Sequence, residues 1–270
     1  MGDVVMVLDS DRYWRKVSTP DPYVGWTTEM SLAFKGKEEI EAYISAPKEI
    51  CITEYAHVFS RSSESSDRIC DMVMGDLVRY CSGTVLGDDG IRSWKEVILP
   101  DDRHGWVRSW EVMDFASWVG TQDCSAENLV SFAKRFLGVP YMWGGISPKH
   151  FDCSGFVKFT YMMLGVLLMR DSSQQIKTGV GVPFDFGLMQ AGDLVFFGNP
   201  ETGRPTHVAL YIGDGRIIHS SQVVRINSLR PEDPDYYGAK EVIAVRRVLG
   251  HIDTGEGVMS WRKHPLYFKQ

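Results

Sequence analysis

A repeated pattern of short runs in the first part of the chain constrains the fold more than any other feature. Residues 2–26 and 75–106 both start with Gly-Asp-x-Val and pass through a polar turn to Trp-x-x-Val. Both then reach a Pro-Asp turn and end with Gly-Trp. Alternating short runs that are divided by Asp, Gly and Pro favour antiparallel strands and tight turns. The repeat therefore predicts two small antiparallel barrels; the alternative is a chance recurrence of short strand patterns.

The two copies differ in length. Residues 56–74 precede the second copy, whereas the first copy has no such segment because the sequence begins at Met1. The pattern resembles the bacterial SH3-like domain, in which a late Gly-Trp strand is typical and an early strand with an Arg-Ser turn takes the place of this segment. The resemblance implies a partial or truncated SH3-like module over 1–45 and a second module over 46–118. Either Met1 is not the natural start, or the first module is degenerate.

The second half of the chain has a different order of elements. Ser125 can cap a helix whose apolar face runs to residue 137, and Gly138 and Pro140 then end it. A second helix is expected from about residue 153 to residue 164. Four strand-like runs follow, at 193–198, 207–213, 216–221 and 241–248. Helices followed by antiparallel strands indicate an α+β domain, which we expect over 119–250, with a C-terminal tail over 251–270.

Charge and hydropathy exclude two classes of protein. The formal net charge is −6, whereas a nucleic-acid-binding protein usually presents a basic face. No apolar run approaches the roughly 20 residues that a transmembrane helix needs. No basic stretch followed by an apolar run marks a secretory signal. The compartment stays open between the cell envelope or periplasm, if the natural N-terminus carries a signal, and the cytoplasm.

One of the five cysteines has polar neighbours. The cysteines form no CxxC pair, so we expect neither a zinc site nor any other metal or cofactor. Four of them are expected to be structural: Cys51, Cys70, Cys81 and Cys124. With Asp152 as the cap of the second helix, Cys153 takes the first helical position, where free N–H groups and the helix dipole favour a thiolate. The small side chains of Ser154 and Gly155 leave room for a substrate.

Two histidines are placed to serve this cysteine. His207 opens one strand-like run and His219 lies near the end of the next, with the turn Gly-Asp-Gly at 213–215 between the two runs. Such a turn favours a β-hairpin, which can bring the two imidazoles side by side. One ring can then act as a base and the other can orient it. The alternative is that both are ordinary histidines at strand ends.

Five motifs in this half resemble the NlpC family of bacterial cell-wall cysteine peptidases. They are YMWGG, FDCSGFV, AGDLVFF, HVALYIGDG and IIHS, in that order within residues 125–247. The resemblance implies a papain-like α+β fold in which Cys153 is the nucleophile, His207 is the general base and His219 orients the base. It also implies that Tyr141 lies beside the nucleophile and, with the N–H of Cys153, stabilises the oxyanion. Trp143, from the same motif as Tyr141, is assigned to substrate binding.

The stretch Arg-Asp-Ser-Ser-Gln-Gln at 170–175 bears on specificity. By itself it is a polar loop in which Asp171 or Ser172 caps the next element. It also resembles the branch of the family that joins two SH3-like modules to the catalytic domain. In that branch the aspartate pairs with the free α-amine of the substrate's first residue. The resemblance implies that Asp171 and Ser172 recognise an N-terminal L-alanine, while Asp152 and Ser154 hold the peptide stem.

These observations together predict a cysteine peptidase with a peptidoglycan stem peptide as its substrate. We expect it to hydrolyse the bond between γ-D-glutamate and the diamino acid in peptides with a free N-terminal L-alanine, in peptide recycling or cell-wall turnover. Two alternatives stay open. One is a D,L-endopeptidase that cuts intact cell wall, and the other is a wall-binding protein without activity.

Overall fold

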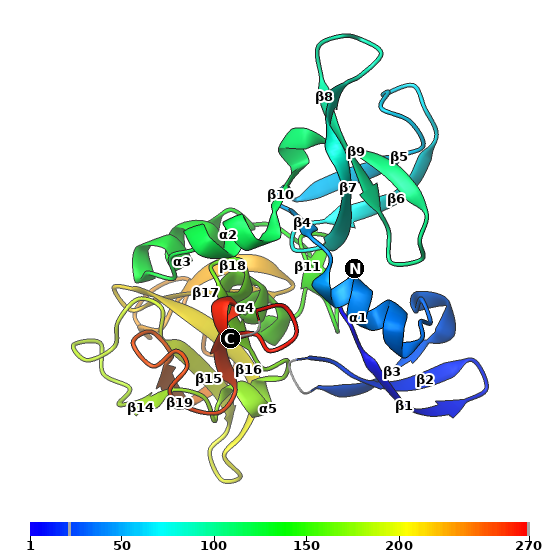
Figure 1. Cartoon of the computed structure of the whole chain (residues 1–270). Helices are drawn as coiled ribbons and strands as arrows, with labels where there is room; N and C mark the ends of the chain where they lie inside the picture. The colour runs from blue at the N-terminus through cyan, green and yellow to red at the C-terminus, as the bar shows by residue number, and fades with distance from the viewer. Residues whose placement is uncertain (21–22, 269–270) are drawn as a thin grey trace. The chain divides into compact units, whose positions relative to one another are not determined.

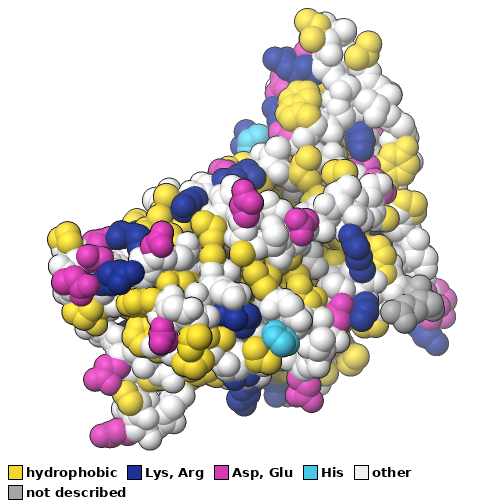
Figure 2. Space-filling view, turned by 90° about the vertical axis from the view of Figure 1, so that its left-hand side faces the viewer, with side chains coloured by type: hydrophobic (Ala, Val, Ile, Leu, Met, Phe, Trp, Pro, Cys, Tyr) yellow, Lys and Arg dark blue, Asp and Glu magenta, His cyan; other side chains and the backbone are white. Residues whose placement is uncertain are grey.

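The computed structural model of the chain describes residues 1–20 and 23–268, which form two compact units (Figure 1). Residues up to Thr121 and the segment that begins at Pro265 make the first unit, and Gln122–His264 make the second. No helix in the described part of the chain is long and apolar enough to cross a membrane. On the face drawn in Figure 2, acidic and basic side chains are interspersed.

The first unit contains two antiparallel sheets. Three strands form the smaller sheet: β1 (Met6–Asp11), β2 (Trp14–Ser18) and β3 (Val24–Thr28). Seven strands form the larger sheet in the order β10-β4-β7-β8-β9-β5-β6. Their bounds are β4 (Lys48–Cys51), β5 (Tyr55–Phe59), β6 (Arg68–Val73), β7 (Leu77–Leu86), β8 (Ser93–Ile98), β9 (His104–Arg108) and β10 (Val112–Asp114). The helices are η1 (Glu29–Ser31), α1 (Lys37–Ser45), η2 (Ser109–Glu111) and α2 (Phe115–Thr121).

The sequence repeat recurs as a structural repeat. In the first copy three consecutive antiparallel strands, β1 to β3, lead into the short 3₁₀ helix η1. In the second copy β7 to β9 lead into η2 in the same way. The segment that only the second copy has forms β5 and β6. The second copy buries an apolar core, whereas every residue of β1 is exposed. The boundaries proposed at residues 45, 118 and 250 stay predictions.

The second unit places its α-helices before its main sheet, and a 3₁₀ helix follows the sheet. The helices are α3 (Ala126–Lys134), α4 (Cys153–Met162), α5 (Ser172–Gln175) and η3 (Trp261–Lys263). The sheet has the order β14-β19-β15-β16-β17-β18 and is antiparallel throughout. Its strands are β14 (Val180–Val182), β15 (Leu194–Asn199), β16 (Arg204–Gly213), β17 (Arg216–Ser221), β18 (Val223–Ser228) and β19 (Glu241–Arg247). Two small pairs complete the unit: β11 (Ile146–Ser147) with β12 (His150–Phe151), and β13 (Val166–Leu168) with β20 (Val258–Ser260). The predicted α+β architecture is confirmed.

Local signals account for where these elements begin. The hydroxyl of Ser125 accepts a hydrogen bond from the N–H of Asn128 at 3.3 Å, which confirms the predicted cap of α3. This helix ends at Lys134, earlier than expected, because residues 135–137 tighten into i→i−3 turns. The hairpin between β16 and β17 turns at Asp214 and Gly215, whose φ angles of 52° and 70° are those of a type I′ turn.

Aromatic packing fixes α4 within the second unit. The side chains of Phe156 and Phe159 are fully buried, and both rings contact Phe151. Phe136, just after α3, packs edge to face against Phe159 with ring centroids 5.4 Å apart. The hydroxyl of Tyr161 donates to the carbonyl of Gly192 at 2.7 Å. The helix that carries Cys153 at its first position is therefore anchored along its whole apolar face.

Candidate active site

The start of α4 is built around the carboxylate of Asp152. Its Oδ1 accepts from the N–H of Gly155 at 2.7 Å, which confirms the predicted N-cap and puts Cys153 at the first helical position. Its Oδ2 accepts from the N–H of Gly144 at 2.9 Å, so the same side chain ties the preceding loop to the helix. The Arg170 guanidinium donates to both oxygens, at 3.1 and 2.5 Å. The position of the nucleophile thus depends on one fully engaged carboxylate.

Glycine is required at position 155 for a reason that the sequence did not indicate. We expected Gly155 to leave room for a substrate. In the structure, a Cβ at this position would overlap the carbonyl oxygen of Gly145. That carbonyl accepts from the N–H of Asp152 at 3.0 Å. The space beside Gly155 is therefore taken by the protein's own backbone, which holds the first turn of α4 in place.

The two histidines meet as the hairpin predicts. His207 on β16 and His219 on β17 lie with Nε2 and Nδ1 only 2.7 Å apart, and their side chains are buried. The Nε2 of His219 lies 3.0 Å from Oδ1 of Asn227 on β18. The Nδ2 of Asn227 in turn donates to the carbonyl of Asp235 at 2.6 Å. A continuous row of hydrogen bonds thus runs from His207 to the backbone of a surface loop.

Burial controls the charges at the site. Burial, together with His219, Lys240 and Arg225, lowers the pKa of His207 to about 3. Burial lowers the pKa of His219 to about 4, against the opposing effect of its hydrogen bond to the Oδ1 of Asn227. Both rings are therefore neutral at pH 7.

The thiol of Cys153 is subject to opposing effects. Burial raises its pKa, and the nearby Asp152 carboxylate raises it further. The N–H groups of Val208 and Ser154, which bond to the sulfur, and the charge of Lys240 lower the pKa. The helix start alone predicts a thiolate, but burial outweighs it, so the resting site holds a thiol and a neutral imidazole. The bond from Val208, the neighbour of His207 in the chain, places the sulfur beside the backbone of β16 next to that histidine.

The other groups that we assigned to the site are the Tyr141 hydroxyl, the N–H of Cys153 and the indole of Trp143. Burial raises the pKa of the Tyr141 hydroxyl, and the charges of Cys153 and Asp152 raise it further. The backbone of Tyr141 pairs with that of Phe151, two residues before Cys153. Within the described residues, the N–H of Cys153 donates to no protein acceptor. It is free to serve as the oxyanion donor that the sequence suggests. The indole of Trp143 is 86% exposed and takes no part in packing the site.

Asp171 and Ser172 lie half-buried at the start of α5. The N–H of Asp171 donates to Oε1 of Gln174 at 3.0 Å. The side-chain amide of Gln175 donates to the carbonyls of Ser154 and Met169, which holds α5 beside the first turn of α4. Ser154 itself is engaged, because its hydroxyl donates to Asp152 and accepts from Arg170.

Sequence reasoning missed several residues of the site. Asn227 extends the histidine pair, and the ring of Tyr237 packs edge to face on His219 with centroids 4.6 Å apart. Arg170 and Gln175 secure the start of α4 from the other side. Arg170 and Gln175 lie at the two ends of the Arg-Asp-Ser-Ser-Gln-Gln stretch, in which we assigned roles only to Asp171 and Ser172, and the recognised motifs contain neither Asn227 nor Tyr237. Only the strand register, in which His219 lies opposite Arg225, puts Asn227 on the same face of the sheet.

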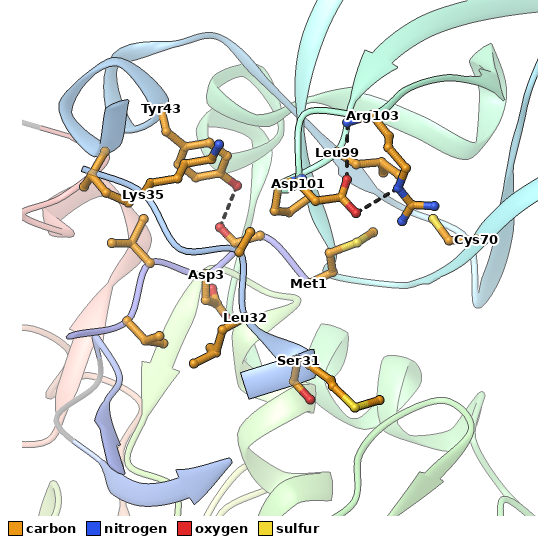
Figure 3. Close-up of a pocket in the computed structure, with 17 residues that line it drawn as sticks. Met1, Asp3, Ser31, Leu32, Lys35, Tyr43, Cys70, Leu99, Asp101 and Arg103 are labelled. Atoms are coloured by element: carbon orange, nitrogen blue, oxygen red, sulfur yellow. Dashed lines mark hydrogen bonds and ion pairs between the residues drawn. The ribbon is translucent and has the colours of Figure 1, made fainter. Parts of the chain in front are cut away.

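Two features of the first unit are separate from this site. Cys81, Glu96 and His104 are, among the residues that the structure describes, the group that could hold a metal ion. Their contacts are already those of a hydrogen-bonded cluster, with Nδ1 of His104 3.0 Å from Glu96. Figure 3 shows a pocket of about 310 Å³ whose walls come entirely from the first unit, with Tyr43 and Leu99 among them. It contains no residue of the Cys153 site.

Comparison with known proteins places this geometry among known peptidases. The NlpC/P60 family matches residues 138–246, a range that includes Cys153, His207 and His219. The gamma-D-glutamyl-L-lysine dipeptidyl-peptidase of Bacillus cereus (strain ATCC 10987 / NRS 248) is 31% identical over 258 residues, which are 92% of this chain and 74% of that protein. Dipeptidyl-peptidase 6 of Lysinibacillus sphaericus is 28% identical over 238 residues, 86% of this chain and 82% of that protein. The crystal structure of an NlpC/P60 family protein from Bacillus cereus ATCC 10987 superposes with a TM-score of 0.74 at 30% identity, over 91% of this chain and 79% of that one.

Proposed function

Since the chain belongs to the NlpC/P60 family of cysteine peptidases that hydrolyse peptidoglycan, we propose that it cleaves the amide bond between γ-D-glutamate and the diamino acid of stem peptides with a free N-terminal L-alanine. The name of the Bacillus cereus relative, a gamma-D-glutamyl-L-lysine dipeptidyl-peptidase, supports this bond. The match supports the choice because it runs through both units of the chain and not only through the catalytic unit.

The chemistry follows from the residues at the start of α4 and on the hairpin. The sulfur of Cys153 attacks the carbonyl carbon of the amide while its proton passes to His207. The oxyanion is stabilised by the N–H of Cys153 and the hydroxyl of Tyr141. The carbon–nitrogen bond then breaks, and His207 returns the proton to the leaving amine. Water attacks the resulting thioester with His207 as base, which releases the γ-carboxylate and restores the thiol of Cys153.

The observation that carries the specificity is the difference between two aspartates. Asp152 is bound by Arg170 and by two backbone N–H groups, so its charge is already neutralised within the protein. Asp171, the residue immediately before α5, takes part in no ion pair with any residue that the structure describes. A half-buried carboxylate without a cation favours an ammonium ligand. This supports Asp171 as the group that pairs with the substrate's α-amine.

The test compares free and N-acetylated L-Ala-γ-D-Glu-L-Lys with the wild-type protein and with Asp171→Asn. A charge-assisted hydrogen bond contributes roughly 1.5–3 kcal/mol. We therefore expect acetylation to lower kcat/KM of the wild-type protein about 10- to 150-fold. Asp171→Asn should lower kcat/KM for the free peptide and narrow its advantage over the acetylated one. Glu127→Gln, which removes an exposed carboxylate of the same unit, is the matched control and should behave like the wild type.

The same measurement separates the alternatives. If the wild-type protein cleaves both peptides equally and also digests intact sacculi, the D,L-endopeptidase reading replaces this one. If purified protein cleaves neither peptide nor sacculi, the chain is a wall-binding protein. Replacing lysine by diaminopimelate in the free peptide determines which diamino acid the site prefers.

A further inference from the structure

The row of hydrogen bonds beyond His207 has a definite direction. Its outer end is the carbonyl oxygen of Asp235, which can only accept. The atom of Asn227 that faces this carbonyl must therefore be the amide nitrogen, and Oδ1 must face His219. Reversing the amide would put two acceptors 2.6 Å apart. The orientation of the Asn227 side chain is thus set by a main-chain group.

That orientation passes through both imidazoles. Because Oδ1 of Asn227 is an acceptor, the Nε2 of neutral His219 carries the proton and its Nδ1 is left as an acceptor. The Nδ1 of His219 faces Nε2 of His207 at 2.7 Å, so the proton of neutral His207 is on Nε2 as well. The lone pair of His207 then lies on Nδ1. A neutral imidazole has one protonated nitrogen, which donates, and one unprotonated nitrogen, which accepts. Once the role of one nitrogen is fixed, the role of the other follows.

We propose that Asn227 is a positioning residue that selects the tautomer of both histidines and so keeps the Nδ1 lone pair of His207 available as the base. This inference rests on the proposed peptidase chemistry of Cys153 and His207. Asn227 contacts His219 and not the reacting atoms, so it acts through the histidine pair. Asn227 lies outside the IIHS motif, eight residues after His219 in the chain, yet it determines which nitrogen of each ring carries the proton.

The surroundings keep the row intact. His219 has no exposed surface, and the ring of Tyr237 packs on both imidazoles, with centroids 4.6 Å from His219 and 5.5 Å from His207. Water therefore has little access to replace the amide as the partner of His219. Arg225, opposite His219 in the register of β17 and β18, disfavours a second proton on that ring. A neutral pair without Asn227 would lack a group that distinguishes the two tautomers.

The direct test is a measurement of tautomers by ¹⁵N nuclear magnetic resonance. In the Cys153→Ala protein no thiol can exchange a proton with His207, so the ring spectrum reports the row alone. We expect both His207 and His219 to be Nε2–H tautomers at pH 7. In Cys153→Ala combined with Asn227→Leu, the signal of His219 should shift toward a mixture of tautomers. The control combines Cys153→Ala with Asn128→Leu, which replaces an exposed asparagine of the same unit. In this control His219 should keep the Nε2–H form.

The kinetic arm uses Asn227→Leu and Asn227→Ala with the thiol intact. One hydrogen bond of this kind contributes about a factor of ten, so kcat should fall about tenfold while KM stays near its wild-type value. A purely structural role would lower the melting temperature and leave the tautomers unchanged. An Nδ1–H tautomer of His219 in the Cys153→Ala protein, or unchanged tautomers in Asn227→Leu, would overturn the proposal. The tautomer measurement needs no substrate, so an error in the proposed specificity leaves it unaffected.

Discussion

The protonation state of Cys153 in the resting protein has a measurable consequence. Burial raises the pKa of the thiol and lowers the pKa of His207 to about 3, so the proton is on sulfur at pH 7. Only the thiolate reacts with iodoacetamide. The alkylation rate should therefore rise roughly tenfold per pH unit from pH 6 upward while the pH lies below the thiol pKa.

Mass spectrometry of the labelled peptides measures this rate for each cysteine. Cys51 and Cys124 serve as internal controls, because burial raises their pKa values to about 11 and about 12 and they should react later. A rate for Cys153 that is already constant from pH 5 upward would mean that a thiolate–imidazolium pair exists in the resting site. That result would contradict the conclusion that burial has the largest effect on the pKa of Cys153.

At the scale of single residues, the sequence predicts those groups whose neighbours in the chain reveal them. Asp152 was recognisable as a cap because it immediately precedes the helix, and its bond to the N–H of Gly155 confirms this. The closeness of His207 and His219 was predictable because a short turn joins their strands. Tyr237 could not be predicted in the same way. It reaches the histidines from a loop whose course depends on tertiary packing.

The site depends most on the first turn of α4, which positions Cys153. A substitution of Gly155 tests how tightly this turn is packed. In Gly155→Ala the new Cβ would overlap the backbone carbonyl of Gly145, which cannot move like a flexible side chain. We expect a loss of about 1–3 kcal/mol in the free energy of unfolding. We also expect kcat/KM to fall, because the turn that positions Cys153 must shift.

The matched control is a second helical glycine. Gly120 on α2 has open space where a Cβ would lie. Gly120→Ala should therefore raise the free energy of unfolding by up to about 1 kcal/mol, through helix propensity alone. Chemical denaturation and kinetic assays of both variants decide the matter. Equal free energies of unfolding for the two variants would show that the carbonyl of Gly145 does not exclude a side chain at position 155.

At the scale of elements, the starts of helices were more predictable than the places where two distant backbone segments come into contact. The caps at Ser125 and Asp152 depend on residues within one turn, which a sequence displays directly. The requirement at Gly155 depends on Gly145, which reaches it only after the loop between them has folded. A small residue in a motif indicates that space is limited, but it does not identify what fills the space. This is why we assigned that space to substrate.

At the scale of the whole molecule, the path of the chain gives a further prediction. The segment after His264 belongs to the first unit, where the rings of Tyr267 and Phe268 lie 5.8 and 5.5 Å from Phe115. Deleting residues 265–270 removes both ring contacts, each contributing about 1 kcal/mol beyond its buried area. Hydrogen exchange should quicken in α2 and β4 and stay unchanged in α4 and the main sheet of the second unit. Uniform protection across both units in the deleted protein would contradict this assignment.

The return of this segment to the first unit also affects how the protein is made. A ribosome releases residues 1–121 well before Tyr267 and Phe268, because the whole catalytic unit is synthesised in between. During that interval Phe115 lacks the two aromatic partners that it has in the finished chain. The first unit is therefore synthesised before the catalytic unit but completed after it, and it reaches its full stability only when Tyr267 and Phe268 have been translated.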